Sequence, residues 1–128
     1  MDWERYKPYF TRDEFLCTCG CGRAEMDQEF MDMLMRARQE ANVPFDITRG
    51  SGFRCPDHNR AVGSTSVNHT SGKAADIPAR SNFIRARILA GLYAAGFRRI
   101  GISFQEGAEF VHCDSRWPEA PESCWPYP

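Results

Sequence analysis

The sequence predicts an α+β fold in which two principal helices pack on a small, mostly antiparallel sheet. Two stretches carry apolar side chains at intervals of three or four residues, one from Asp27 to about Asn42 and one from about Asn82 to about Ala95. Short apolar or alternating stretches bounded by glycines lie after each of them and indicate strands. A chain of 128 residues fits one domain with a single core.

Each predicted helix has a start signal and a stop signal. Asp27 can cap the first helix, and Pro44 stops it; Ser81 or Asn82 can cap the second, and Gly96 ends it. A shorter helix is expected after Thr11, which begins a capping-box pattern, and another is expected after the proline at position 56. The apolar stripes consist of Phe30, Leu34, Ala37 and Ala41 in the first helix, and of Ile84, Ile88, Leu92 and Ala95 in the second.

Four stretches are expected to be strands. Residues 45–48 are a short apolar stretch leading into a glycine-rich loop, and residues 74–77 are small or apolar around one aspartate. Residues 98–104 alternate, and residues 109–114 follow after a turn. The tail, residues 117–128, contains half of the eight prolines, so neither helix nor strand is expected there. It either wraps over the domain or lines one lip of the binding cleft.

Charge and hydropathy exclude several classes of partner. The formal net charge is −1, so we expect no strong attraction to nucleic acid or to an anionic membrane. No apolar run is long enough to span a bilayer. Residues 1–7 lack the apolar core of a secretion signal, which predicts synthesis in the cytoplasm. We expect a monomer.

Six cysteines are many for a protein made in a reducing compartment. Cys17, Cys19 and Cys21 alternate, which differs from the paired Cys-x2–4-Cys spacing of zinc fingers. Three interpretations stay open: buried free thiols, a second metal site at the alternating cysteines, or disulfides formed after release from the cell. A bond between Cys113 and Cys124 would hold the tail in place.

His69 and Asp76 can bind one metal ion only if the chain reverses between them. On a continuous helix, a spacing of seven residues separates two side chains by about 10 Å along the axis, whereas zinc ligands lie about 2.0–2.2 Å from the ion. Gly72 permits the reversal. His112 supplies a second imidazole. Two nitrogens and one oxygen form the ligand set of a catalytic zinc site, whose fourth position is kept for water, so the sequence predicts one catalytic Zn²⁺.

These motifs resemble the zinc D-alanyl-D-alanine carboxypeptidase family, which includes vancomycin-resistance dipeptidases and many bacteriophage endolysins. The similarity extends from about Phe10 to Asp114. Three elements carry it in the order of the family: the phage-type start from Tyr9 to Cys21, the stretch from Ser51 to Gly63 with Arg54 near its beginning, and the pair His69-x-x-Gly72-x-Ala74-x-Asp76 and Glu109-x-x-His112-x-Asp114.

The resemblance implies roles for residues around the metal. Arg54 would hold a carbonyl or carboxylate oxygen of the substrate, because a guanidinium can donate two parallel hydrogen bonds; Arg49 is the competing arginine. Asp114 would orient a ligand imidazole from behind. Ser51 and Ser66 are further candidates for substrate contacts.

The resemblance also implies that Glu109 is the proton-transferring carboxylate, since the family places this residue three positions before the second histidine. In a regular strand, however, Glu109 and His112 would point to opposite faces. Glu109 must therefore precede the regular strand, or Glu106 acts in its place.

The function implied is a zinc metallopeptidase that hydrolyses the stem or crosslink peptides of peptidoglycan, as an endolysin-like endopeptidase or a D,D-carboxypeptidase. A protein of this kind would reach the cell wall after release from the cytoplasm. The first alternative is a non-catalytic, zinc-stabilised module that binds cell wall or protein, as the similar hedgehog signalling domain holds zinc without catalysis. The second is a thiol-based metal or redox protein built on the cysteine cluster.

Overall fold

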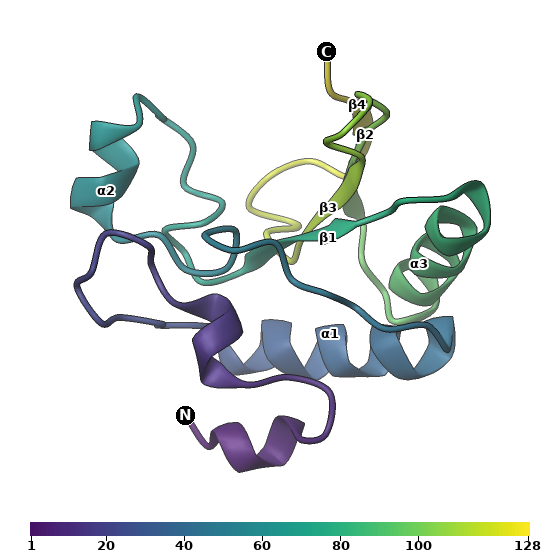
Figure 1. The fold of residues 1–128 in the computed structure, drawn as a ribbon, viewed down its shortest axis with the longest axis horizontal. Helices are drawn as coiled ribbons and strands as arrows, with labels where there is room; N and C mark the ends of the chain where they lie inside the picture. The colour runs from purple at the N-terminus through teal and green to yellow at the C-terminus, as the bar shows by residue number, and fades with distance from the viewer.

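In the computed structural model, which describes residues 1–128, helices are the only regular elements in the first half of the chain, and the second half contains the strands and one further helix (Figure 1). The α+β class is confirmed. Two short 3-10 helices come first, followed by three α-helices and four strands. In chain order they are η1 (Trp3–Tyr6), η2 (Arg12–Phe15), α1 (Gln28–Ala41), α2 (Pro56–Ala61), β1 (Ala74–Pro78), α3 (Asn82–Ala94), β2 (Arg99–Ser103), β3 (Phe110–Asp114) and β4 (Ser123–Pro126).

The two long helices begin where the capping signals place them. The Asp27 carboxylate accepts a hydrogen bond from the Phe30 N–H (2.9 Å) at the start of α1. Ser81, rather than its neighbour, caps α3 by accepting from the Ile84 N–H (3.1 Å). Each side chain satisfies one of the backbone donors that a first helical turn leaves unpaired.

The four strands form one mixed sheet in the order β1-β3-β2-β4. Strand β3 pairs antiparallel with both β1 and β2, whereas β4 pairs parallel with β2. Two expectations about strands were wrong. Residues 45–48 form no ladder; their one strand-like contact is the hydrogen bond from the Thr48 N–H to the Asp76 carbonyl (3.0 Å). The tail contains β4, because an edge strand tolerates proline.

Strand alternation divides the sheet into an apolar face and a polar face. Residues paired across the strands share a face, so Ala75, Cys113 and Ile100 lie together in the core. The next residues along the strands, among them Asp76, His112 and Asp114, therefore point the opposite way. Figure 1 shows α1 and α3 on the side of the sheet away from α2. The polar face of the sheet is therefore the face that carries the candidate functional site.

Helices α1 and α3 approach each other closely at Gly91. A Cβ atom placed there would lie 2.7 Å from the Ala41 Cβ and would also overlap the Ala37 carbonyl oxygen. The absence of a side chain at Gly91 thus sets the distance between the two helices. None of the helices combines the length and the apolar character needed to cross a membrane.

Candidate active site

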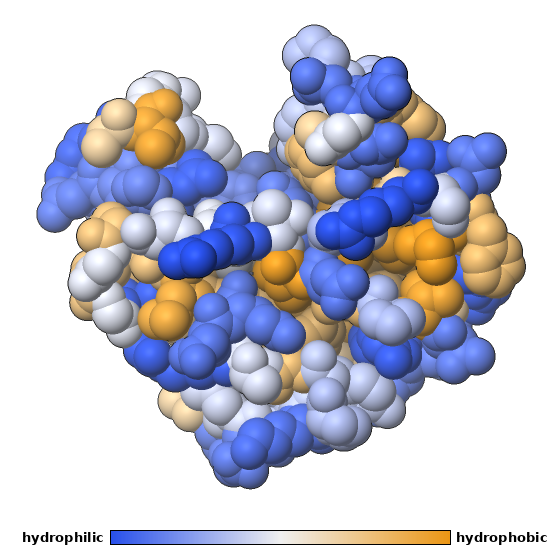
Figure 2. All heavy atoms as spheres, viewed as in Figure 1, coloured by the Kyte–Doolittle hydropathy of each residue, from blue (hydrophilic) through white to orange (hydrophobic).

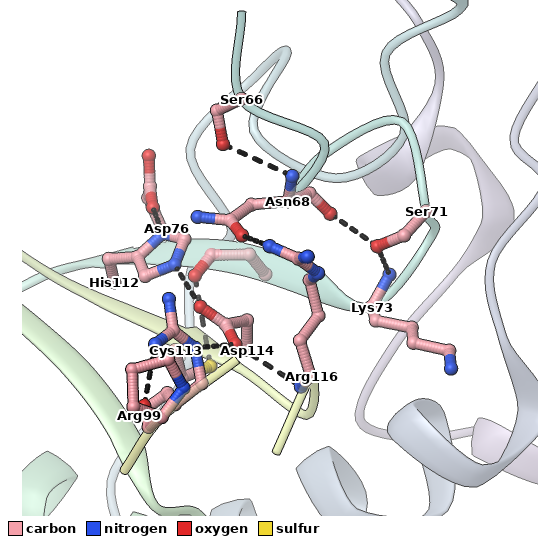
Figure 3. A network of polar contacts seen from close by, with 12 residues as sticks. Ser66, Asn68, Ser71, Lys73, Asp76, Arg99, His112, Cys113, Asp114 and Arg116 are labelled. Atoms are coloured by element: carbon pink, nitrogen blue, oxygen red, sulfur yellow. Dashed lines mark hydrogen bonds and ion pairs between the residues drawn. The ribbon is translucent and has the colours of Figure 1, made fainter. Parts of the chain in front are cut away.

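The centre of the polar face is a pair of side chains on neighbouring strands. Asp76 of β1 lies directly opposite His112 of β3 in the antiparallel ladder. Their side chains therefore project from the same face, and the His112 Nδ1 lies 2.9 Å from an Asp76 carboxylate oxygen (Figure 3). The His112 side chain is almost fully buried, with 2% of its surface exposed.

His69 reaches this pair from the loop between α2 and β1. His69, Asp76 and His112 each offer one ligand atom, and these three atoms lie within 4.8 Å of one another. The loop reverses at Gly72, whose φ of 72° is in the left-handed region that favours glycine. The structure thus brings together three residues that are up to 43 positions apart in the chain.

Two contacts hold the His69 loop in place. The Gly72 carbonyl accepts a hydrogen bond from the Asp27 N–H (2.9 Å) at the start of α1, and a Cβ at Gly72 would overlap the Glu25 carbonyl oxygen. On the other side, the Asn68 side-chain oxygen accepts from the Arg116 guanidinium (2.6 Å), just beyond β3 (Figure 3). The loop is therefore positioned by both the helix layer and the sheet.

Asp114 lies behind His112. Its carboxylate is fully buried and lies 2.9 Å from the His112 Nε2, so the two ring nitrogens of His112 face two different carboxylates (Figure 3). The other Asp114 oxygen accepts from the Arg99 Nε (2.7 Å) and from the Arg116 N–H (3.2 Å). Arg99 was not anticipated, because only the register of β2 against β3 places it opposite Asp114.

These contacts determine the protonation of the site. Burial by itself lowers the pKa of His112, but the hydrogen bonds to Asp114 and Asp76 outweigh it and raise the pKa to about 9. Burial raises the pKa of Asp114, yet the hydrogen bonds from His112 and Arg99 hold that pKa below its usual value. Burial lowers the pKa of His69, which favours the neutral imidazole that binds metals.

The donor set fits a zinc ion. Zinc accepts both imidazole nitrogens and carboxylate oxygens, and three protein ligands leave a position open for water. The Nδ1 of His69 is buried without a hydrogen-bond partner, so this ring has capacity for a further ligand. In metal sites, a carboxylate typically accepts a hydrogen bond from the second ring nitrogen of a ligand histidine and so fixes the orientation of the ring. Asp114 has this position relative to His112.

Glu109 lies just outside the regular strand, since β3 begins at Phe110. Strict alternation therefore does not apply to it. Glu109 is half-buried and, with Asp76, lines a cavity of about 570 Å³. Arg49, the competing arginine, lines the same cavity. Glu106 is exposed and is not part of the cavity lining.

Arg54 lies beside His69 rather than in that cavity. Its backbone N–H donates to the His69 carbonyl (3.2 Å), and its guanidinium donates to the Asn59 side-chain oxygen (3.1 Å). Ser51 is buried and engaged with the backbone: its hydroxyl donates to the Thr48 carbonyl (2.7 Å) and accepts from the Asp76 N–H (3.0 Å). Ser51 thus supports β1.

Ser66 is exposed in the loop that precedes His69. Its hydroxyl accepts from the Asn68 N–H (3.2 Å), and its carbonyl accepts from the Asn59 amide (3.0 Å). Asn59 therefore joins the guanidinium of Arg54 to the backbone at Ser66. This link was not anticipated from the sequence, since it depends on how α2 packs against the loop.

Residues 8–114 match the sequence model of one protein family, described as peptidase M15. The chain belongs to the peptidase M15 family. Among curated proteins, none matches the chain. M15 enzymes are zinc-dependent metallopeptidases, so the hydrolase class, the zinc requirement and a peptide as substrate follow from membership. The match includes His69, Asp76, His112 and Asp114 and ends before Arg116.

The end of this M15 peptidase, beyond the family match, contributes two aromatic side chains to the site. The Trp125 and Tyr127 rings lie 5.5 Å and 6.5 Å from the His112 ring, measured between centroids. Gly101 makes room for them, because a Cβ there would lie 2.5–2.7 Å from atoms of both rings. The tail is thus ordered by the pairing of β4 with β2 and places both rings beside His112, without a Cys113–Cys124 bond, since both cysteines are unpaired.

The surface of the M15 domain is hollowed above the sheet. Figure 2 shows a notch between the lobe that contains α2 and the end of the sheet that contains β2 and β4. In the same view, β1 and β3 run beneath this notch (Figure 1). The notch above the strands that carry Asp76 and His112 thus has two walls. One wall is formed by the α2 lobe and the other includes the C-terminal strand β4.

Proposed function

We propose that the protein hydrolyses peptide bonds in the stem or crosslink peptides of peptidoglycan. The observation that carries this proposal is the convergence of His69, Asp76 and His112 within 4.8 Å on the polar face of the sheet, with Asp114 behind. Membership of the M15 family supports peptide hydrolysis with zinc. The choice of peptidoglycan rests on the similarity of the motifs to cell-wall peptidases.

The chain's own residues prepare this site for a metal. Asp114 accepts the hydrogen bond of the His112 Nε2–H, which leaves Nδ1, the ring nitrogen beside Asp76, as the atom that would bind a metal after losing its proton. Arg99 keeps Asp114 charged. His69, Asp76 and His112 would hold the zinc ion, whose Lewis acidity would supply activation of a water molecule and polarisation of the scissile carbonyl.

Glu109 is proposed as the general base. It faces the cavity that Asp76 also lines, so a peptide lying there brings the attacking water close to both. The Glu109 carboxylate takes the proton of that water and then gives it to the leaving amine. Arg54, held by Asn59 beside His69, binds a carbonyl or carboxylate oxygen of the peptide.

Purified cell walls provide the test. We expect wild-type protein to clear walls embedded in a gel, and a chelator to abolish the clearing. Glu109→Gln should lower kcat about 10²–10⁴-fold with an unchanged zinc content, while Glu106→Gln, a matched change at an exposed neighbour, should leave activity intact. Wall binding by the wild type without any cleavage would instead support the non-catalytic binding module.

The finer proposal is an endolysin-like enzyme that acts on the cell wall after release from the cytoplasm. It depends on which peptide bond the protein cuts. The candidates are the L-alanyl-D-glutamate bond, a D-alanyl-diaminopimelate crosslink and the terminal D-alanyl-D-alanine bond. Mass spectrometry of the released muropeptides distinguishes them, since each product has a different mass. Release of free D-alanine alone would contradict the endopeptidase and favour the carboxypeptidase.

A further inference from the structure

Four cysteines form a cluster that the hydrolytic site does not use. The sulfur atoms of Cys17, Cys19, Cys21 and Cys55 lie within 4.8 Å of one another. Cys55 was not part of the cluster expected from the sequence, since it lies 34 positions after Cys21. We propose that these four residues bind a second zinc ion, as a closed structural site separate from His69, Asp76 and His112.

The sulfur–sulfur distances favour a shared metal over disulfides. The Cys19 Sγ lies 3.5 Å from that of Cys17 and 3.6 Å from that of Cys55. Four thiolates about 2.3 Å from a tetrahedral zinc are about 3.8 Å from one another, whereas a disulfide requires about 2.05 Å. All six cysteines of the chain are unpaired. A disulfide joins two sulfur atoms, whereas here four sulfur atoms lie close to one another.

The local backbone brings the sulfurs together. The alternating cysteines follow η2, and the chain bends at Gly20 and Gly22, whose φ values of 90° and 75° are left-handed. A Cβ at either glycine would meet no other atom, so the glycines are needed for backbone conformation rather than for space. Cys55 comes from the N-cap of α2.

Backbone donors prepare the sulfurs to carry charge. The Cys55 N–H donates to the Cys17 Sγ (3.4 Å), and the His58 N–H donates to the Cys55 Sγ (3.4 Å). Such bonds favour the thiolate, which is the form that binds metal. The His58 ring is engaged elsewhere, with its Nε2 3.3 Å from the Thr18 hydroxyl, and it is outside the four-sulfur set.

The ligand chemistry selects zinc and a structural role. Four sulfur ligands favour a soft or borderline cation over Ca²⁺ or Mg²⁺, which prefer oxygen. A set of four protein ligands leaves no position for water, so this site stabilises structure rather than activates a nucleophile. The metal would join residues 17–21 to the residue next to Arg54, whose N–H in turn holds the His69 carbonyl (3.2 Å).

Metal stoichiometry tests the proposal without any measurement of hydrolysis. Full-length protein purified under reducing conditions with zinc should contain about two zinc ions per chain by native mass spectrometry. The double variant Cys19→Ser/Cys21→Ser, which changes the two exposed ligands, should retain about one. Cys124→Ser, an exposed cysteine outside the cluster, should retain two, and His69→Ala should lose the other ion.

Two further measurements keep the test independent of how the cysteine variants fold. Replacement of zinc by cobalt should produce the thiolate-to-cobalt charge-transfer absorption of a tetrahedral sulfur site, still present in His69→Ala. The thiols of Cys19 and Cys21, which are exposed, should react slowly with a thiol reagent until a chelator is added, whereas the exposed Cys124 should react at once. One zinc ion per chain together with fast reaction of Cys19 and Cys21, or with disulfides among the four cysteines, would overturn the second site.

Discussion

At the scale of single residues, His112 determines the polarity of the site. Its ring is buried between Asp76 and Asp114, and Arg99 balances the charge of Asp114 from the neighbouring strand. A histidine whose Nε2–H is held by a carboxylate has a fixed orientation, and only its Nδ1 is left to bind a metal. The contact between His112 and Asp114 therefore prepares the Nδ1 of His112 as a metal ligand.

Asp114→Asn should weaken zinc binding at the His69, Asp76 and His112 set about 10–100-fold, because a neutral amide holds the ring less firmly and makes it less basic. Competition with a chelator of known affinity measures the change. Asp13→Asn, a matched change at an exposed position, should have no effect. An unchanged dissociation constant for Asp114→Asn would show that this carboxylate does not support the ligand.

Tyr6, which is not part of the candidate site, makes the stability of the folded protein depend on pH. Tyr6 is fully buried, and its hydroxyl donates to Asp32 (3.0 Å). Burial contributes most and this hydrogen bond contributes next, and together they raise the pKa of Tyr6 from 10.0 to about 12. The folded state thus keeps a proton that the unfolded state loses, so this stabilisation is complete below pH 10 and is lost as the pH rises from 10 to about 12.

We therefore expect Tyr6→Phe to reduce the slope of the free energy of unfolding against pH between pH 10 and 12. Urea unfolding at a series of pH values measures the slope. Tyr9→Phe, at a partly exposed tyrosine, provides the comparison. Parallel pH profiles for wild type and Tyr6→Phe would mean that the buried hydroxyl does not cause the alkaline loss.

At the scale of elements, close packing between α1 and α3 supports the sheet from its apolar side. The helices meet where Gly91 of α3 faces Ala37 and Ala41 of α1. Small residues on both helices allow their backbones to approach. The apolar residues of the strands pack against this pair, so a displaced helix would disturb the strands that carry the site.

Gly91→Ala should lower the free energy of unfolding by about 1–3 kcal/mol, because the added methyl group overlaps the backbone and side chain of α1. An alanine in an open helix position would have the opposite effect, since it has the higher helix propensity. Chemical denaturation measures the difference, with Ala86→Ser on the exposed face of α3 as control. A stabilised Gly91→Ala would show that the helices can separate without penalty.

At the scale of the whole molecule, the ligands of the predicted zinc site come from separate parts of the chain. His69 lies in a loop after α2, Asp76 on β1 and His112 on β3. A metal bound by all three exists only in the folded state, so its binding free energy adds to stability. The same loop is tied to the start of α1 and to Arg116 after β3, which couples the site to both layers.

Removal of metal should therefore lower Tm. Zinc at about 100 times its dissociation constant stabilises the folded state by about 2.7 kcal/mol, so thermal unfolding after chelation should begin at clearly lower temperature. Added Zn²⁺ should restore Tm, whereas Mg²⁺ should not. His112→Ala should respond less to chelation than the wild type; an equal response would locate the stabilising metal elsewhere.

Local signals in the sequence were sufficient for the main helices and for the chain reversal between His69 and Asp76. The capping residues and apolar stripes of α1 and α3 act within one or two helical turns, so they can be recognised without the rest of the chain. The reversal between His69 and Asp76 was predictable because only glycine adopts the left-handed conformation there at little cost, and Gly72 does so.

Other features depend on the pairing of distant segments and were decided by the tertiary structure. Residues 45–48 have a strand-like sequence but find no partner for a ladder, whereas the proline-containing β4 finds one along β2. The contacts of Arg99 with Asp114, and of Trp125 with His112, follow from strand register. Cys55 joins the other cysteines because α2 packs beside them. Register and packing are set by the burial of the whole core, which no short stretch of sequence encodes.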